Sequence, residues 1–317
     1  MNDTLLKAKG VFKKYMKKYN EVIIIYCLLM LFIILSAILD KNFLSIKNLI
    51  NIFATSMPFL MAAYAQTIAI ISGGVDLSVG ATISLVTTIC ATTMMDDTPF
   101  GILSGVLISL VAAVAIGILN GLLITKFKIQ ALIGTLCSSI VIAGIALAIL
   151  DMPGGKVPKG FAKFVSGDAS LIVIFLITTV VLSMMMSRTR LGKSLYATGG
   201  NSQAAYNVGI NVTKTKILSF AVGGILTALA GIILACQMRS GDPTAGNPIT
   251  IKTLTASVIG GASFSGGKGR IICTFAGAMI FAIINNMLNL LGISTFYQYV
   301  AQGVLLILAI AITSKSK

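Results

Sequence analysis

Histidine and tryptophan are absent from the 317-residue chain, and nine acidic residues stand against 24 lysines and arginines. A chain without histidine lacks the side chain that most often serves as a general base or a metal ligand. An intramembrane serine protease would need such a base, and an aspartyl protease would need two acids. One acid, Asp76, lies outside the expected aqueous loops and tails. We therefore expect a protein that is not an enzyme.

Charged residues are also scarce, at 10% of the chain, whereas soluble domains carry about 25%. Hydrophobic residues make up 56%, and the mean hydropathy is +0.98. This composition indicates an all-α, polytopic membrane helix bundle surrounded by lipid. Five cysteines lie far apart without metal-ligand spacing, so we interpret them as packing residues. The net charge of +15 is attributed to basic loops that fix the topology, not to nucleic-acid binding.

The hydrophobic segments predict about ten transmembrane helices in one domain that covers 1–317, because a span needs about 20 apolar residues. The third segment follows the second after a glycine-rich break, and the eighth is short and rich in threonine and serine, so these two have the weakest patterns. The predicted spans are 22–39, 49–71, 78–95, 101–125, 131–150, 169–187, 217–238, 251–264, 271–291 and 296–313.

The distribution of positive charge predicts the orientation. With the N-terminus inside and the spans alternating, the inside segments hold 17 of the 24 lysines and arginines, and the outside segments hold 7. The positive-inside rule therefore favours an N-in, C-in topology. This topology places the basic segment 1–21 and the polar segment 188–216 in the cytoplasm.

The polar segment 188–216 contains the signals of a short helix. Asn201 is a good N-cap, Ser202 to Val208 include two strong helix formers, and Gly209 can adopt the left-handed conformation that ends a helix. Two turns of helix are not stable alone in water, so the helix must dock. Ala204 and Ala205 would let another protein approach closely.

Two glycine-rich motifs stand out, GGVDLSVG at 73–80 and GGASFSGG at 260–267. The first contains Asp76, and an acid at membrane depth indicates function because it is costly there. Three interpretations of Asp76 stay open: a cap for the third span, part of a substrate path, or a proton carrier. Both motifs are expected near the cytoplasmic face, so they do not fit matched positions of an inverted repeat.

A nucleotide site is not indicated. The phosphate-binding loop requires a glycine, four residues and then Gly-Lys followed by serine or threonine. Gly192–Lys193–Ser194 has the final part, but Ser187 stands at the first glycine position. Gly267–Lys268 has Ala262 at that position. We therefore do not expect this chain to hydrolyse ATP by itself.

Several motifs together resemble the ribose-type sugar permease subunits of bacterial ABC importers, within the branched-chain amino acid and sugar permease superfamily. The resemblance runs from about Asn48 to the C-terminus. Each motif is weak alone, but their order and spacing are specific. The matching pieces are GGVDLSVG at 73–80, Asn120–Gly121, LGKSLYATGGNSQAAYNVGI at 191–210, DPTAG at 242–246, VIGGASFSGGKG at 258–269 and NNMLNLLGIS at 285–294.

The resemblance implies a multi-pass protein of the bacterial cell membrane that pairs with a second copy or a sister permease. It implies a cytoplasmic ABC ATPase, which would carry the ATP and magnesium, and an extracytoplasmic sugar-binding protein. No cofactor is expected on this chain. The short helix would be the coupling helix, because Gln203–Gly209 fits Glu-Ala-Ala, three residues and Gly with Gln for Glu. The coupling residues would be Asn201, Ser202, Gln203, Ala204, Ala205 and Gly209.

The cargo is expected to be a monosaccharide such as ribose. Many ribose permeases carry Tyr-Glu-Leu-Asp where this chain has Ile249, Thr250, Ile251 and Lys252. Nucleosides or another small polar solute are therefore an alternative, and an ion-coupled secondary transporter is a rival of a different class. A path for a neutral solute should be mildly polar, and its candidate residues are Asp76, Gln66, Ser84, Asn120, Thr135, Asn285 and Asn286.

Overall fold

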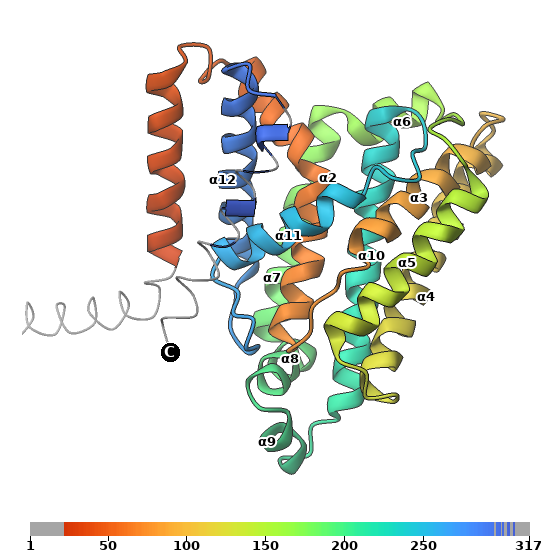
Figure 1. Cartoon of the computed structure of the whole chain (residues 1–317), viewed down its shortest axis with the longest axis vertical. Coiled ribbons are helices and arrows are strands. Elements are labelled where there is room, and N and C mark those ends of the chain that lie inside the picture. The colour runs from red at the N-terminus through yellow and green to blue at the C-terminus, as the bar shows by residue number, and fades with distance from the viewer. Residues whose placement is uncertain (1–21, 295, 299, 301–302, 305–306, 308–317) are drawn as a thin grey trace, which may run out of the picture.

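A computed structural model describes residues 22–294, 296–298, 300, 303–304 and 307 of the chain. The elements named within these residues are all helices, which form one bundle (Figure 1). They are Val22–Leu39, α2 (Ile46–Ile71), α3 (Val79–Thr93), α4 (Pro99–Thr125), α5 (Ala131–Ile149), α6 (Lys159–Ser166), α7 (Asp168–Arg188), α8 (Arg190–Gly200), α9 (Ser202–Asn207), α10 (Val212–Met238), α11 (Asn247–Ile259) and α12 (Ile271–Leu290).

Seven of these helices are long and apolar enough to cross a membrane: Val22–Leu39, α2, α4, α5, α7, α10 and α12. They correspond to seven of the ten predicted spans. The third and eighth predictions need correction, because α3 has 15 residues and α11 has 13, too few to cross a bilayer of ordinary thickness. The tenth predicted span, 296–313, lies largely outside the described residues, as does the basic segment 1–21.

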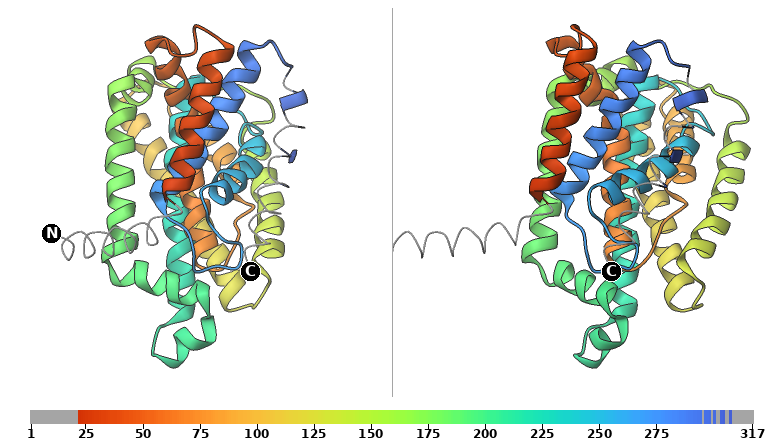
Figure 2. Two further views of the ribbon diagram at one scale, coloured as in Figure 1. Left: turned by 90° about the vertical axis from the view of Figure 1, so that its left-hand side faces the viewer. Right: turned by 60° about the vertical axis from the view of Figure 1, so that its left-hand side comes forward.

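The polar segment 188–216 is more ordered than predicted. It contains two helices, α8 and α9, joined through Asn201, and α10 already begins at Val212. α8 was not predicted, because its glycines and polar residues give it no long apolar run. α9 lies at the extreme end of the bundle, opposite the end that carries α6 (Figures 1 and 2).

Close backbone packing holds the long helices together. α10 contacts α2, α3 and α4, so it lies at the centre of the bundle. On α4, a Cβ on Gly117 would overlap the carbonyl oxygen of Phe220, and a Cβ on Gly121 would lie 2.7 Å from the Cα of Ile217. The G-x-x-x-G spacing of α4 therefore serves packing within the chain.

A pair of matching turns relates the two halves of the bundle. The first turn contains Asp76, Ser78 and Gly80 at the start of α3. The second contains Asp242, Thr244 and Gly246 just before α11, each 166 residues after its counterpart. In the first turn, Asp76 Oδ1 accepts from the Ser78 N–H (2.9 Å) and hydroxyl (2.6 Å). In the second, Asp242 Oδ1 accepts from the Thr244 N–H and hydroxyl, both at 2.7 Å.

The beginnings of α3 and α11 meet and exchange hydrogen bonds. The Gly80 N–H donates to Thr250 Oγ1 (3.1 Å), and the Gly246 N–H donates to Ser84 Oγ (2.9 Å). The packing partners are reciprocal as well, since α3 packs on α10 and α4 while α11 packs on α2 and α12. α2 runs toward α8, whereas α10, its counterpart before α11, runs away from α8. The half that contains α2 and α3 and the half that contains α10 and α11 are therefore inverted repeats.

The repeat also shows which segment of the second half corresponds to the first glycine-rich motif. GGVDLSVG corresponds to the segment around DPTAG, not to GGASFSGG. The short helices α3 and α11 follow from the same arrangement. Each begins at its contact with the other, where Gly80 and Gly246 are both buried.

Candidate functional site

The short helix α9 is built by the local signals that the sequence carries. Asn201 Oδ1 accepts from the Ala204 N–H at 2.9 Å, which caps the first turn. Gly209 has a φ of +83°, and the Ile210 N–H donates to the Ala205 carbonyl at 3.0 Å. This closing bond is typical of a glycine-terminated helix. The predicted helix 202–208 is observed as Ser202–Asn207, with Val208 as its C-cap.

α9 turns one side of its surface outward and the other into its own chain. Gln203 and Ala204 are exposed, and the large apolar side chains of Tyr206 and Val208 are 69% and 77% exposed. Ala205 is 3% exposed. The expectation that both alanines face a partner therefore needs correction: Ala204 faces outward, while Ala205 packs inside this chain.

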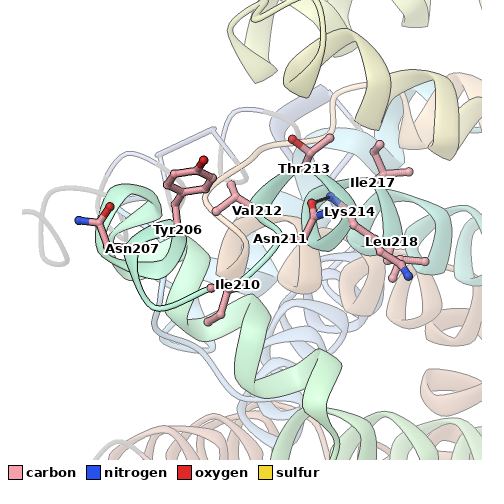
Figure 3. Close-up of a pocket in the computed structure, with 10 residues that line it drawn as sticks. Tyr206, Asn207, Ile210, Asn211, Val212, Thr213, Lys214, Ile217 and Leu218 are labelled. Carbon is pink, nitrogen blue, oxygen red and sulfur yellow. Dashed lines mark hydrogen bonds between the residues drawn. The ribbon is translucent and has the colours of Figure 1, made fainter.

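An open groove of ≈ 1070 Å³ runs from α9 to the beginning of α10 (Figure 3). Tyr206 stands at one end, and the α10 side chains Thr213, Lys214 and Ile217 stand along the other. The remaining lining residues are Asn207, Gly209, Ile210, Asn211, Val212 and Leu218. Lys214 is the one charged residue among them, so the groove and the exposed side of α9 form a mildly basic, partly apolar surface. We call it the α9 surface.

The segment that leads from α2 to α3 is a second candidate site, because it carries Asp76 at 8% exposure. The Asp76 carboxylate bonds Ser78, the N-cap residue of α3, and not the free N–H groups inside the first turn. Asp76 therefore shapes the turn before α3 instead of capping the helix directly.

Three fully buried side chains from three helices brace this segment. Gln66 of α2, in the amide orientation that satisfies both atoms, donates to the Asp76 carbonyl (2.8 Å) and accepts from the Asp76 N–H (3.3 Å). Asn120 of α4 donates to Ser78 Oγ (2.8 Å). Thr135 of α5 accepts from the Leu77 N–H (3.0 Å). Four of the predicted path residues, Gln66, Asp76, Asn120 and Thr135, thus belong to one polar cluster.

The other predicted path residues lie elsewhere. Ser84 is fully buried at the contact of α3 with α11, where it accepts from Gly246. Asn286 exchanges hydrogen bonds of 3.0 and 3.2 Å with Asn48 at the beginning of α2. Asn285 donates to the Phe281 carbonyl one turn earlier at 3.1 Å. The seven candidates therefore occupy three separate places.

Sequence reasoning missed Asp242, Thr244 and Thr250, which form the second half of the pseudo-symmetric contact. The signal was present as D-x-[S/T]-x-G followed four residues later by serine or threonine, at 76–84 and 242–250. Among the described residues, no group of three or more cysteine, aspartate and glutamate side chains is arranged to hold a metal ion.

Comparison with known proteins places these features in a family. The model described as "Branched-chain amino acid transport system / permease component" matches residues 48–310. The ribose import permease protein RbsC of Escherichia coli K12 is 34% identical over 304 residues, covering 91% of this chain and 92% of the relative. RbsC of Bacillus subtilis 168 is 36% identical, covering 90% and 91%. The D-allose transport system permease protein AlsC of Escherichia coli K12 is 32% identical, covering 95% and 93%. No solved structure showed significant similarity.

Proposed function

Since this chain belongs to the family of branched-chain amino acid transport system permease components, we propose that it forms the translocation path for a monosaccharide and receives the ATP-driven motion through α9. The family makes the chain a permease subunit of an ABC importer and a multi-pass protein of the inner membrane. The observation that carries the coupling role is the α9 surface, a capped helix with exposed apolar side chains at the extreme end of the bundle.

We infer the orientation of the bundle from the distribution of its charges. At the end that carries α8 and α9, the described residues include nine cations: Lys126, Lys128, Arg188, Arg190, Lys193, Lys214, Lys216, Lys268 and Arg270. The end that carries α6 has six cations and six acids (Asp40, Asp96, Asp97, Asp151, Asp168 and Asp242). This asymmetry supports a cytoplasmic α9 surface by the positive-inside rule. We also propose the N-in, C-in topology, with about ten membrane-embedded helices in a single domain.

The family implies an ATPase and a periplasmic binding protein as partners. We assign the ATPase to the α9 surface and the binding protein to the α6 end. ATP and magnesium then belong to the ATPase, and this chain binds no cofactor of its own. The second permease is another copy of this chain or a sister chain. Closure of the ATPases displaces α9 and shifts the bundle between two packings.

The cargo is proposed from the relatives, whose names specify ribose and D-allose. A monosaccharide is therefore the first choice, with a nucleoside or another small polar solute as the alternative. Thr250 bonds Gly80 at the repeat contact, and Lys252 lies two residues further on α11. These are the two positions where many ribose permeases carry acids.

The polar cluster around Asp76 is proposed as the gate of the path. Its members join α2, α4 and α5 to the entry of α3. A shift of these helices must therefore break or exchange hydrogen bonds in this cluster. Ser84 contributes at the neighbouring contact of α3 with α11, and Asn285 and Asn286 lie near the C-terminal end of α12.

The test is uptake into proteoliposomes that contain the permease, its ATPase and its binding protein, with labelled ribose, allose, galactose and a nucleoside compared in parallel. We expect uptake of one monosaccharide that requires ATP and persists when ionophores collapse ion gradients. Uptake that does not require ATP and stops when the ionophore is added would support an ion-coupled secondary transporter. Preference for the nucleoside would move the cargo to the alternative.

A further inference from the structure

We infer that Gly199, in the last turn of α8, is the positioning residue through which displacement of α9 reaches both halves of the bundle. This inference rests on the proposed coupling role of α9 and adds the route inside the chain. α8 ends at Gly200 and α9 begins at Ser202, so a single residue separates them. Motion of α9 therefore acts on the end of α8 at once.

Three backbone segments meet at Gly199 without side chains between them. A Cβ on Gly199 would overlap the carbonyl oxygen of Ile71, the last residue of α2, and would lie 2.7 Å from the Gly267 nitrogen. The Gly267 N–H donates to that same Ile71 oxygen at 2.9 Å. A Cβ on Gly73 would lie 3.5 Å from the Gly199 Cα. Gly199 thus touches the first repeat at α2 and the second repeat at the loop 260–270.

The loop 260–270 is fixed on α8 by conformations that favour glycine. Gly266 and Gly267 have φ values of +78° and +71°. A Cβ on Gly266 would overlap the Gly199 carbonyl, and a Cβ on Gly267 would lie 2.7 Å from the Gly200 Cα. The two glycine-rich motifs of the sequence therefore converge on one place, the C-terminal end of α8.

One side-chain hydrogen bond reinforces this contact. Tyr196, one turn before Gly200, donates its hydroxyl to the Gly269 carbonyl at 2.8 Å. Burial raises the pKa of the Tyr196 phenol, and the nearby Arg270 charge lowers it in part. The hydroxyl therefore remains protonated in the physiological range and keeps donating this bond.

The physical consequence is a stiff connection. A side chain between two helices can change rotamer and absorb a small displacement, whereas backbones in direct contact move together. Displacement of α8 is then passed to α2, which leads into α3, and to the loop that joins α11 with α12. The beginnings of α3 and α11 meet at Gly80 and Gly246, so both repeats shift at the same time.

The test compares Gly199→Ala with Gly200→Ala in the full complex with its ATPase and binding protein. A Cβ on Gly200 would meet nothing within 4 Å, so this variant is a matched control one residue away. The readouts are ATPase retention on purification and solute transported per ATP hydrolysed. We expect Gly199→Ala to retain the ATPase and to lower the transport ratio at least about tenfold, while Gly200→Ala behaves like the parent chain.

Three outcomes would overturn the inference: a parental ratio in Gly199→Ala, an equal loss in Gly200→Ala, or loss of the ATPase from Gly199→Ala. If Gly199→Ala does not accumulate in the membrane, the transport ratio of Tyr196→Phe is measured in its place, because this variant removes one hydrogen bond and keeps the ring. A ratio lowered severalfold in Tyr196→Phe supports the route, and a parental ratio contradicts it. Retention of the ATPase by Ala204→Arg would instead count against the proposed function, because Ala204 lies on the α9 surface itself.

Discussion

Gly80 and Gly246, from the two inverted halves of the bundle, lie against each other so closely that neither has room for a side chain. A Cβ on either residue would overlap the carbonyl oxygen of the other. Each N–H donates to a hydroxyl of the opposite half, Gly80 to Thr250 and Gly246 to Ser84. The contact joins α3 to α11 at the centre of the pseudo-symmetric repeat.

The first prediction concerns the space at this contact. Gly246→Ala should destabilise the fold by about 1–3 kcal/mol, because backbone atoms must move to admit the methyl group. Thermal unfolding of the purified permease measures the effect. Gly144→Ala on α5 is the control, since a Cβ there meets nothing within 4 Å, and alanine favours a helix. If Gly246→Ala and Gly144→Ala unfold at the same temperature, the contact between Gly80 and Gly246 has room for a methyl group.

The second prediction concerns the exchanged hydrogen bonds. Thr250→Val keeps the shape of the side chain but leaves the Gly80 N–H without its acceptor, and an unpaired buried donor costs about 1–3 kcal/mol. Ser84→Ala should have a similar effect through Gly246. Thr55→Val serves as a comparison, because the exposed Thr55 hydroxyl donates to the Asn51 carbonyl of its own helix. Equal stability of all three variants would mean that the reciprocal bonds contribute little.

The third prediction separates the interpretations of Asp76. Asp76→Asn should fold and transport at a reduced rate, because the Asn Oδ1 can still accept from the Ser78 N–H and hydroxyl. A proton carrier would lose its transport and its pH dependence together in this variant. Uptake measured over a pH series in parent and variant distinguishes the two. Asp76→Leu, which has no acceptor, should lose transport in either case.

The fourth prediction is topological. In a cysteine-free background, Gly160→Cys on α6 should react with an impermeant reagent from outside, and Asn207→Cys on α9 should react from the cytoplasm. Both positions are exposed. Reaction of the two cysteines from the same side would contradict the orientation.

The features that depend on neighbouring residues could be predicted from the sequence, whereas the packing of distant segments could not. α9 was predicted to within one residue because Asn201 and Gly209 act through bonds to their near neighbours. Seven long spans were predicted because hydrophobic length is a property of each segment alone. The family was also recognisable, since the order of several weak motifs extends through most of the chain.

The errors arose where one segment is shaped by another far away. α3 and α11 were expected to span the membrane, but each begins at the Gly80–Gly246 contact inside the bundle. The match between the turns at 76–80 and 242–246 depends on an aspartate and a hydroxyl two residues later, a pattern that the glycine pairs of the sequence do not mark. Whether the Ala205 side chain faces outward or into the chain depends on how α9 packs against the rest of the chain, which no local signal specifies.

The most direct test of the coupling role is retention of the ATPase by a permease altered on the α9 surface. Ala204→Arg adds a long charged chain to an exposed position that we assign to the interface, where an unpaired charge costs several kcal/mol if it is buried. Gly160→Arg makes a comparable change at the opposite end, where a Cβ would meet nothing within 4 Å. Both variants should accumulate in the membrane, since both sites lie outside the long spans. We predict that the ATPase is lost on purification of Ala204→Arg and retained by Gly160→Arg; full retention by Ala204→Arg, with parental uptake, would contradict the account.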